Sequence, residues 1–216
     1  MISIGESLFL KNKKDAFNKI EDLYQHYSKF IKALFSSPEF VEKGKKSIES
    51  HFSFMKGTLN SFYNRRLNKE LLAQGELLST QLFSLYLQEQ KIDAHLLPAL
   101  DFMFIDNDKE PDINYIREHL QPMLDDKKGA NLFVTQGYIC RNYDGEIENL
   151  KRGGSDYSAT LIGAALRSEE VQIWTDIDGM HNNDPRVVDK TYPISYLSFN
   201  EASELAYFGA KILHPA

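Results

Sequence analysis

The fold is decided by residues 151–158, which read Lys-Arg-Gly-Gly-Ser-Asp-Tyr-Ser. These residues stand between a hairpin predicted over residues 142–150, around Asp144-Gly145, and a helix predicted over residues 155–167. The apolar run that follows, residues 171–175, is typical of a strand that is buried on both faces. Strands that alternate with helices predict an α/β fold with a largely parallel sheet.

The same segment places a cation, two glycines, a hydroxyl and a carboxylate at the start of a helix. Free backbone N–H groups and the helix dipole favour an anion there, and Gly153 and Gly154 allow it to come close. Arg152 is a candidate bidentate clamp for a carboxylate or phosphate, and Asp156 is a candidate to orient a substrate amine or hydroxyl. The alternative is an ordinary glycine turn, with Ser155 or Asp156 as the helix N-cap.

A second candidate site lies further along, where residues 174–179 read Trp-Thr-Asp-Ile-Asp-Gly. Thr175 and Asp176 would lie at the carboxyl end of the strand predicted before them, which is where open α/β sheets bind ligands. A carboxylate there suits a ribose hydroxyl or a hydrated Mg²⁺ ion. The alternative is an Asx turn that closes the strand.

Two cations near the end of the chain are candidate phosphate ligands. Arg186 follows the turn residues Asn-Asp-Pro, and Lys211 follows a helix predicted from a capping box at Ser198 and Glu201 up to Phe208. The alternatives are a surface arginine and a lysine that compensates the last carbonyl groups of the helix.

The first 129 residues are predicted to be mainly helical. Apolar residues recur at three- and four-residue steps over residues 12–35, 39–66 and 69–90, which indicates packing between helices rather than a ligand-binding box. After a short strand over residues 91–97, Asp112 is predicted to cap a helix that runs to residue 124. A strand over residues 132–140, interrupted by Gly137, begins the α/β part.

One pair of residues inside the third predicted helix stands out. Gly75 costs about 0.8–1 kcal/mol relative to alanine in a helix, which suggests close packing or the close approach of a ligand. Glu76 beside it is a candidate partner for a ligand ammonium group. The alternative is an ordinary exposed glutamate.

The composition excludes several classes of protein. The 216 residues carry 25 basic and 31 acidic groups, a net charge of −6 that argues against nucleic acid and anionic membranes as partners. No apolar run approaches the roughly 20 residues of a membrane span. The single cysteine, Cys140, indicates a reducing compartment, here the cytoplasm, and a buried strand position rather than a nucleophile. The six histidines show no metal-binding spacing.

Five motifs resemble those of the aspartate kinase family in order and spacing: residues 134–139, 152–157, 174–179, 183–186 and 208–215. A looser match covers residues 74–77. The resemblance implies a three-layer α/β/α sandwich of the amino-acid-kinase, carbamate-kinase-like type around a mostly parallel sheet. It also implies transfer of the γ-phosphoryl group of ATP to the side-chain carboxylate of L-aspartate, which gives aspartyl 4-phosphate. This reaction opens the biosynthesis of lysine, methionine, threonine and isoleucine.

The resemblance also implies roles for individual residues. Glu76 would bind the substrate ammonium group, and Arg152 would clamp a substrate carboxylate beside Gly153, Gly154 and Ser155. Arg152, Ser155 and Asp156 would form the catalytic group. Mg²⁺ would arrive with ATP, without a direct protein ligand. The expected ATP contacts are Thr175, Asp176, His181, Arg186, Lys211 and Ile212.

The sequence departs from the family pattern at several positions. His181 replaces a usual tyrosine, Phe104-Ile105 an Arg-Thr pair, and Lys151 a glycine. The family's opening Lys-Phe-Gly-Gly-Thr-Ser loop and its closing ACT domains have no counterpart here. We therefore expect a partial catalytic domain, truncated at both ends and impaired in activity. Residues 1–129 would form its substrate side and residues 130–216 its nucleotide- and substrate-binding part. The full-length protein is expected to form a homodimer.

Two alternatives remain. One is another amino-acid kinase, similar to glutamate 5-kinase or uridylate kinase, although the Arg-Gly-Gly-Ser-Asp run argues against both. The other is a non-catalytic module that binds a ligand or a second subunit.

Overall fold

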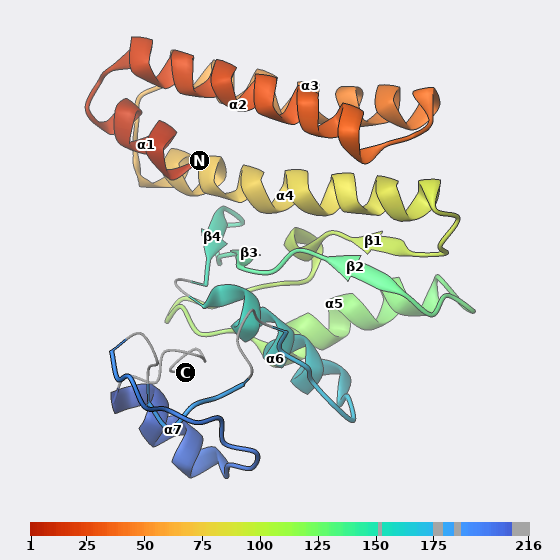
Figure 1. Ribbon diagram of the computed structural model, residues 1–216, viewed down its shortest axis with the longest axis vertical. Helices are drawn as coiled ribbons and strands as arrows, with labels where there is room; N and C mark the ends of the chain where they lie inside the picture. The colour runs from red at the N-terminus through yellow and green to blue at the C-terminus, as the bar shows by residue number, and fades with distance from the viewer. Residues whose placement is uncertain (151–152, 175–178, 184–186, 209–216) are drawn as a thin grey trace.

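The computed structural model describes residues 1–150, 153–174, 179–183 and 187–208. The described chain stacks in layers (Figure 1). Helices α1 (Ile2–Phe9), α2 (Lys13–Leu34) and α3 (Pro38–Thr58) form a helical layer at one end of the molecule. The long helix α4 (Arg65–Glu89) separates this layer from four short strands and the helices α5 (Ile113–Asp125) and α6 (Gly154–Leu166), which together form the α/β layer.

Local side-chain chemistry sets where the helices begin. Asn12 caps α2 by accepting a hydrogen bond from the Asp15 N–H at 3.1 Å, and Asn64 caps α4 by accepting from the Leu67 N–H at 2.8 Å. The three helices predicted in this region are confirmed. The predicted second helix was too long, because the chain must leave α3 before Asn64 can cap the next helix. Helix α1 was not predicted.

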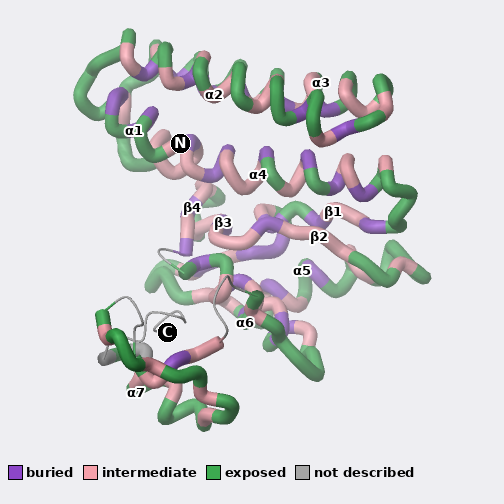
Figure 2. The backbone as a smooth tube through the Cα atoms, in the orientation of Figure 1, coloured by how far each residue is buried: buried purple, intermediate pink, exposed green. Residues whose placement is uncertain are grey.

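Two hydrophobic clusters form the core, and α4 contributes to both. Leu71, Leu78 and Leu82 pack into the cluster of the helical layer, whereas Ala73 packs into the cluster of the α/β layer. Buried residues therefore occur on α4 and on both sides of it (Figure 2). A helix that is covered on two faces lacks the single apolar stripe of a surface helix.

The strands pair in two short ladders. β1 (His95–Leu97) pairs in parallel with β2 (Phe133–Thr135), with Leu96 opposite Val134. β3 (Ile139–Arg141) and β4 (Ile147–Asn149) form an antiparallel hairpin, whose turn contains Gly145 at a φ of +74°. The predicted break at Gly137 and the predicted hairpin around Asp144-Gly145 are both confirmed.

The predicted helix caps are also confirmed. Asp112 accepts hydrogen bonds from the Asn114 and Tyr115 N–H groups at 2.9 and 3.0 Å, at the start of α5. At the start of α7 (Phe199–Phe208), the Glu201 carboxylate accepts from the Ser198 N–H at 2.8 Å, and the Glu201 N–H donates back to the Ser198 hydroxyl at 3.3 Å. These reciprocal bonds form the expected capping box.

One predicted strand is not found among its described residues. The described part of the apolar run, residues 171–174, has no regular secondary structure, and Trp174 is 88% exposed. An apolar run of this length does not by itself distinguish a buried strand from a connecting segment.

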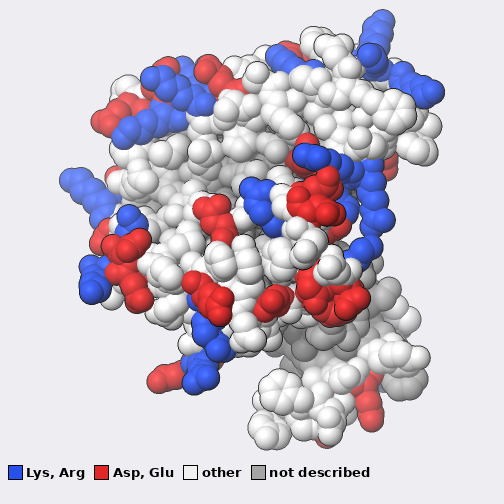
Figure 3. Space-filling view, turned by 180° about the vertical axis from the view of Figure 1, so that it is seen from behind, with Lys and Arg blue, Asp and Glu red and all other residues white. Residues whose placement is uncertain are grey.

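The described surface agrees with the charge balance of the sequence. Seen from behind, basic and acidic side chains are intermingled on the face shown in Figure 3. Within the described residues, no helix has the length and apolar composition needed to cross a membrane.

Candidate active site

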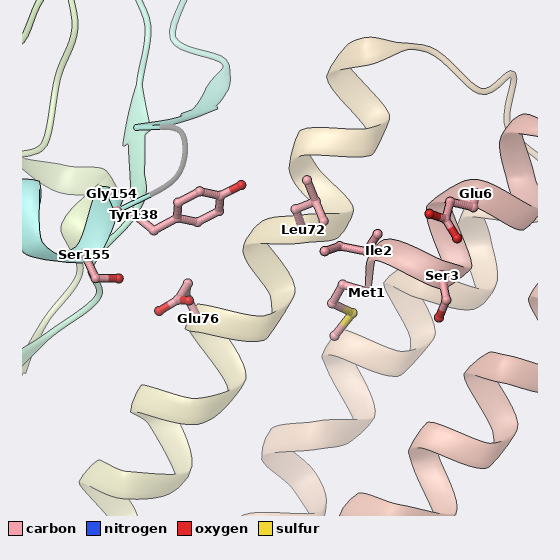
Figure 4. A pocket seen from close by; sticks show the side chains of 10 residues that line it. Met1, Ile2, Ser3, Glu6, Leu72, Glu76, Tyr138, Gly154 and Ser155 are labelled. Atoms are coloured by element: carbon pink, nitrogen blue, oxygen red, sulfur yellow. The ribbon is translucent and has the colours of Figure 1, made fainter. Parts of the chain in front are cut away.

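A cavity of about 700 Å³ lies where α1, α4 and the start of α6 approach one another (Figure 4). We call it the Glu76 cavity. It brings together residues that are far apart in the sequence: Met1, Ile2, Ser3, Glu6, Leu72, Glu76, Tyr138, Gly153, Gly154 and Ser155. Four of the residues expected to bind substrate, Glu76, Gly153, Gly154 and Ser155, therefore line one space.

Glu76 is half-buried on the side of α4 that faces α6. Its carboxylate points toward the Ser155 side of the cavity, and the ring of Tyr138 reaches over the same space (Figure 4). Burial raises the pKa of the Glu76 carboxyl group, since the charged form loses part of its hydration. A ligand ammonium group would return that lost stabilisation. Glu76 is therefore not fully exposed, and its role as the partner of an ammonium group stays a prediction.

Two glycines allow the loop between β2 and β3 to lie against α6. A Cβ atom on Gly137 would come within 2.9 Å of the Ser155 Cα atom, and one on Gly154 would come within 3.0 Å of the Tyr138 ring. Tyr138 lies between them at a φ of +69°. Its N–H donates to the Ser158 hydroxyl at 3.0 Å, which ties this strained residue to α6.

The start of α6 is open toward the cavity. Gly153, at a φ of +76°, is the N-cap and makes no side-chain capping bond. The helix begins at Gly154, so Ser155 and Asp156 lie in its first turn and neither is the N-cap that the alternative interpretation required. The N–H groups of a first helical turn and the positive end of the helix dipole favour an anion at this place.

A buried glutamine that sequence reasoning missed connects β2 to α4. The side-chain oxygen of Gln136 accepts from the Ala99 N–H at 2.7 Å, and its amide N–H donates to the Thr80 hydroxyl at 2.7 Å. That hydroxyl donates in turn to the Glu76 carbonyl oxygen at 2.8 Å. This chain of bonds holds the turn of α4 that carries Glu76. The only sequence signal for this role of Gln136 is its position at the end of a predicted strand.

Gly75 does not have the packing role that one interpretation gave it. A Cβ atom there would meet only the Met1 side chain, at an ordinary contact distance of 3.8 Å.

Cys140 is confirmed as a buried strand residue, and burial raises the pKa of its thiol to about 12. Such a thiol is unreactive at neutral pH.

Most residues expected on the ATP side, and the expected clamp Arg152, lie outside the described residues: Arg152, Thr175, Asp176, Arg186, Lys211 and Ile212. His181 is described and buried, and its Nδ1 atom lies 2.9 Å from the Thr191 hydroxyl. The described residues contain no group of three or more His, Cys, Asp or Glu side chains that could hold a metal ion. Mg²⁺ therefore stays a prediction that depends on the phosphates of ATP.

Comparison with known proteins identifies the family. The sequence model described as "Amino acid kinase family" matches residues 11–216. The chain belongs to the amino acid kinase family. Among curated family relatives, it is 42% identical to lysine-sensitive aspartokinase 3 of Escherichia coli over 154 residues, which cover 69% of this chain and 34% of the relative. It is 37% identical to chloroplastic aspartokinase 1 of Arabidopsis thaliana over 157 residues, which cover 69% of this chain and 27% of the relative.

A solved family structure confirms the α/β fold class. The crystal structure of E. coli aspartokinase III in complex with aspartate and ADP matches 99% of this chain at a TM-score of 0.82 and 31% identity. The match covers 49% of that chain. The sequence match thus spans about a third of the length of the E. coli relative, and the structural match about half of the solved chain.

Proposed function

We propose that this chain is part of an aspartate kinase, which transfers the γ-phosphoryl group of ATP to the side-chain carboxylate of L-aspartate. The bond between the γ-phosphorus and the bridging oxygen breaks, a new bond forms to the carboxylate oxygen, and ADP and aspartyl 4-phosphate leave. The observation that carries the proposal is the Glu76 cavity, which unites an acidic side chain on α4 with the open start of α6. Similarity to aspartokinases from two organisms supports it.

The chemistry of the cavity matches the charges of aspartate. The substrate carries one ammonium group and two carboxylates. Glu76, whose pKa is raised by burial, suits the ammonium group, because an ion pair stabilises the carboxylate that burial disfavours. The first turn of α6, with Gly154, Ser155 and Asp156, suits a carboxylate or the transferring phosphoryl group, and Arg152 is proposed as its clamp.

The remaining roles are proposals that the resemblance supports. We assign ATP contacts to Thr175, Asp176, His181, Arg186, Lys211 and Ile212. Mg²⁺ would arrive with ATP and would neutralise part of the charge of its phosphates. The cytoplasm is the proposed location, and the homodimer is proposed for the full-length protein. Positioning and charge neutralisation would supply the catalysis, without a covalent intermediate.

Calorimetry with aspartate tests the substrate assignment. We expect the chain to bind L-aspartate and Glu76→Gln to weaken that binding by about tenfold or more, because the variant loses an ion pair in a partly buried site. Glu118→Gln removes an exposed carboxylate from α5 and serves as the matched control. Equal binding by the Glu76 and Glu118 variants would count against the role of Glu76.

An activity assay tests the reaction itself. The chain, ATP, Mg²⁺ and aspartate are incubated with hydroxylamine, which traps an acyl phosphate. Formation of the trapped product from aspartate would support the assignment, and Arg152→Ala in a longer chain should abolish turnover. A substrate panel with glutamate and uridylate separates the aspartate assignment from other amino-acid kinases. Binding of aspartate without any turnover, in this chain and in the longer one, would favour a non-catalytic module.

A further inference from the structure

A second cavity, of about 450 Å³, adjoins the Glu76 cavity, and we call it the Lys69 cavity. It lies between the first half of α4, strand β4 and the loop over residues 105–111. Leu72 and Tyr138 line both cavities, so the two spaces meet at these side chains. Eight polar or charged residues line only the second cavity: Arg65, Asn68, Lys69, Lys109, Glu110, Glu148, Asn149 and Tyr157.

An ion pair gives this cavity its fixed wall. Lys69 on α4 pairs with Glu148 on β4, and the two side chains are only 14% and 11% exposed. Each neutralises the other, and neither has an alternative partner of opposite charge in an ion pair within the described residues. The pair therefore shapes the cavity rather than offering free charge to a ligand.

Two other cations on the cavity wall have no ion-pair partner among the described residues. Arg65 and Lys109 are exposed, and neither makes an ion pair or a side-chain hydrogen bond with another described residue. Lys109 is held in the loop at a φ of +65°. The side-chain amides of Asn68 and Asn149 also make no hydrogen bond within the described chain. The lining thus contains several hydrogen-bond donors that are available to a ligand.

The two cavities differ in charge. The described lining of the Glu76 cavity contains the acidic residues Glu6 and Glu76 and no lysine or arginine. The Lys69 cavity has three basic residues against two acidic ones, a local balance of +1 in a chain whose net charge is −6. The charge of the second lining therefore favours a ligand with a negative group.

We propose that the Lys69 cavity binds a small oxyanion, a phosphate or carboxylate group, between Arg65 and Lys109. The planar guanidinium of Arg65 can donate two parallel hydrogen bonds to such a group, and the Lys109 ammonium adds a point charge. The Asn68 and Asn149 amides supply further donors. The volume lies in the range of small-molecule sites, so the cavity has room for the body of a metabolite as well as its charged group.

This site is separate from the proposed kinase chemistry. None of its cations belongs to the residues that we assign to aspartate or ATP. Its test uses binding alone and can fail or succeed whatever the outcome of the kinase assay.

Nuclear magnetic resonance tests the site. The ¹⁵N-labelled chain is titrated with sodium phosphate at constant ionic strength, balanced with sodium chloride, while the backbone amide signals of Glu110 and Asn149 are followed. We expect saturable shifts. The double variant Arg65→Gln/Lys109→Gln should bind phosphate at least about tenfold more weakly, because both charge-assisted contacts are lost. Unchanged signals elsewhere will show that the variant is folded.

The matched control is Arg167→Gln/Lys91→Gln, which removes one exposed arginine and one exposed lysine away from the cavity lining. It should bind phosphate as the unaltered chain does. A parallel titration with succinate separates the two kinds of oxyanion: saturation by phosphate alone assigns the site to phosphates, and saturation by succinate alone assigns it to carboxylates. Saturation by neither, or equal affinity in the Arg65/Lys109 variant, overturns the proposal.

Discussion

The helical layer and the α/β layer hold together in different ways. In the helical layer, long helices bury rows of large apolar side chains against one another and against α4. In the α/β layer, the strands are three residues long, and glycine contacts, side-chain caps and a buried glutamine fix the loops between them. The first layer thus rests on apolar packing along its helices, whereas the second depends on individual close contacts. Helix α4 belongs to both, and it carries Glu76.

The largest expected effect is a core truncation in the helical layer. Phe52 is 2% exposed, and its ring meets the rings of Tyr24 and Tyr27 edge-on at 5.1 and 5.9 Å. Phe52→Ala should lower the free energy of unfolding by about 3–5 kcal/mol. Because α4 joins the two clusters, hydrogen-exchange protection should also fall in α6.

A second phenylalanine of α3 provides the control. Phe54 is 37% exposed, so Phe54→Ala should change the free energy of unfolding by well under half as much. Denaturant titrations followed by circular dichroism will compare the two variants. Unchanged protection of α6 in the Phe52 variant would mean that the two layers unfold independently.

The next effect concerns the contact between α4 and β4. Lys69→Met leaves Glu148 without its partner in a largely buried position, and we expect a loss of about 3 kcal/mol. Replacing both partners, as Lys69→Met/Glu148→Leu, should recover most of it. The more exposed pair formed by Arg66 and Glu146 joins α4 to the residue just before β4, and Arg66→Met should cost at most about 1 kcal/mol. Similar losses in the two single variants would show that burial does not distinguish the pairs.

A smaller loss is expected where the β2–β3 loop contacts α6. Gly137→Ala places a methyl group against the backbone of Ser155 and should cost about 1–3 kcal/mol. Gly57→Ala, in α3, meets nothing within 4 Å and should gain up to about 1 kcal/mol from helix propensity. Thermal unfolding will show whether Gly137→Ala lowers the stability and Gly57→Ala raises it. A stabilising Gly137→Ala would show that the loop can move away from α6 without cost.

The smallest effect is a dependence on pH at Glu76. Burial raises the pKa of the Glu76 carboxyl group in the folded state. The carboxyl group therefore ionises more readily in the unfolded state, and the free energy of unfolding falls as the pH rises above the unfolded-state pKa. Glu76→Gln is neutral at every pH. It should therefore be more stable than the unaltered chain at pH 7, on the order of a few tenths of a kcal/mol because water screens a half-exposed group. This advantage should vanish below about pH 4, where both states are protonated.

Urea titrations at pH 7 and pH 3.5 will measure this difference, with Glu118→Gln as the control. An advantage for Glu76→Gln that is equal at both pH values would point to packing rather than charge. Combined with weaker aspartate binding, a stabilising Glu76→Gln would mark a residue retained for function at the expense of stability.

The sequence predicts the parts of the fold that local chemistry determines. Asp112 and the Ser198–Glu201 capping box cap the helices that were predicted to follow them, and the Asp144-Gly145 turn closes the predicted hairpin. These predictions succeed because each signal acts within a few residues. The residues 171–174 were misassigned, since only tertiary contacts distinguish a buried apolar run from an exposed one.

The candidate site was predictable in part. Glu76 and residues 153–155 were expected to meet through the resemblance to aspartate kinases, and they line one cavity. Leu72 and Tyr138, which stand between the two cavities, were not expected as lining residues. The positive φ of Tyr138 depends on the contact with α6 and has no sequence signal of its own. The α1 residues of the wall were missed together with their helix.

The buried position of Cys140 has a practical consequence. With a thiol pKa of about 12, roughly one molecule in ten thousand carries a thiolate at pH 8, so maleimide reagents will leave this position unlabelled in the folded chain. Since this is the single cysteine of the sequence, a new one at an exposed position will be the sole labelling site without any background variant. A fluorophore attached through Asp108→Cys, beside the Lys69 cavity, would then make the chain its own optical sensor.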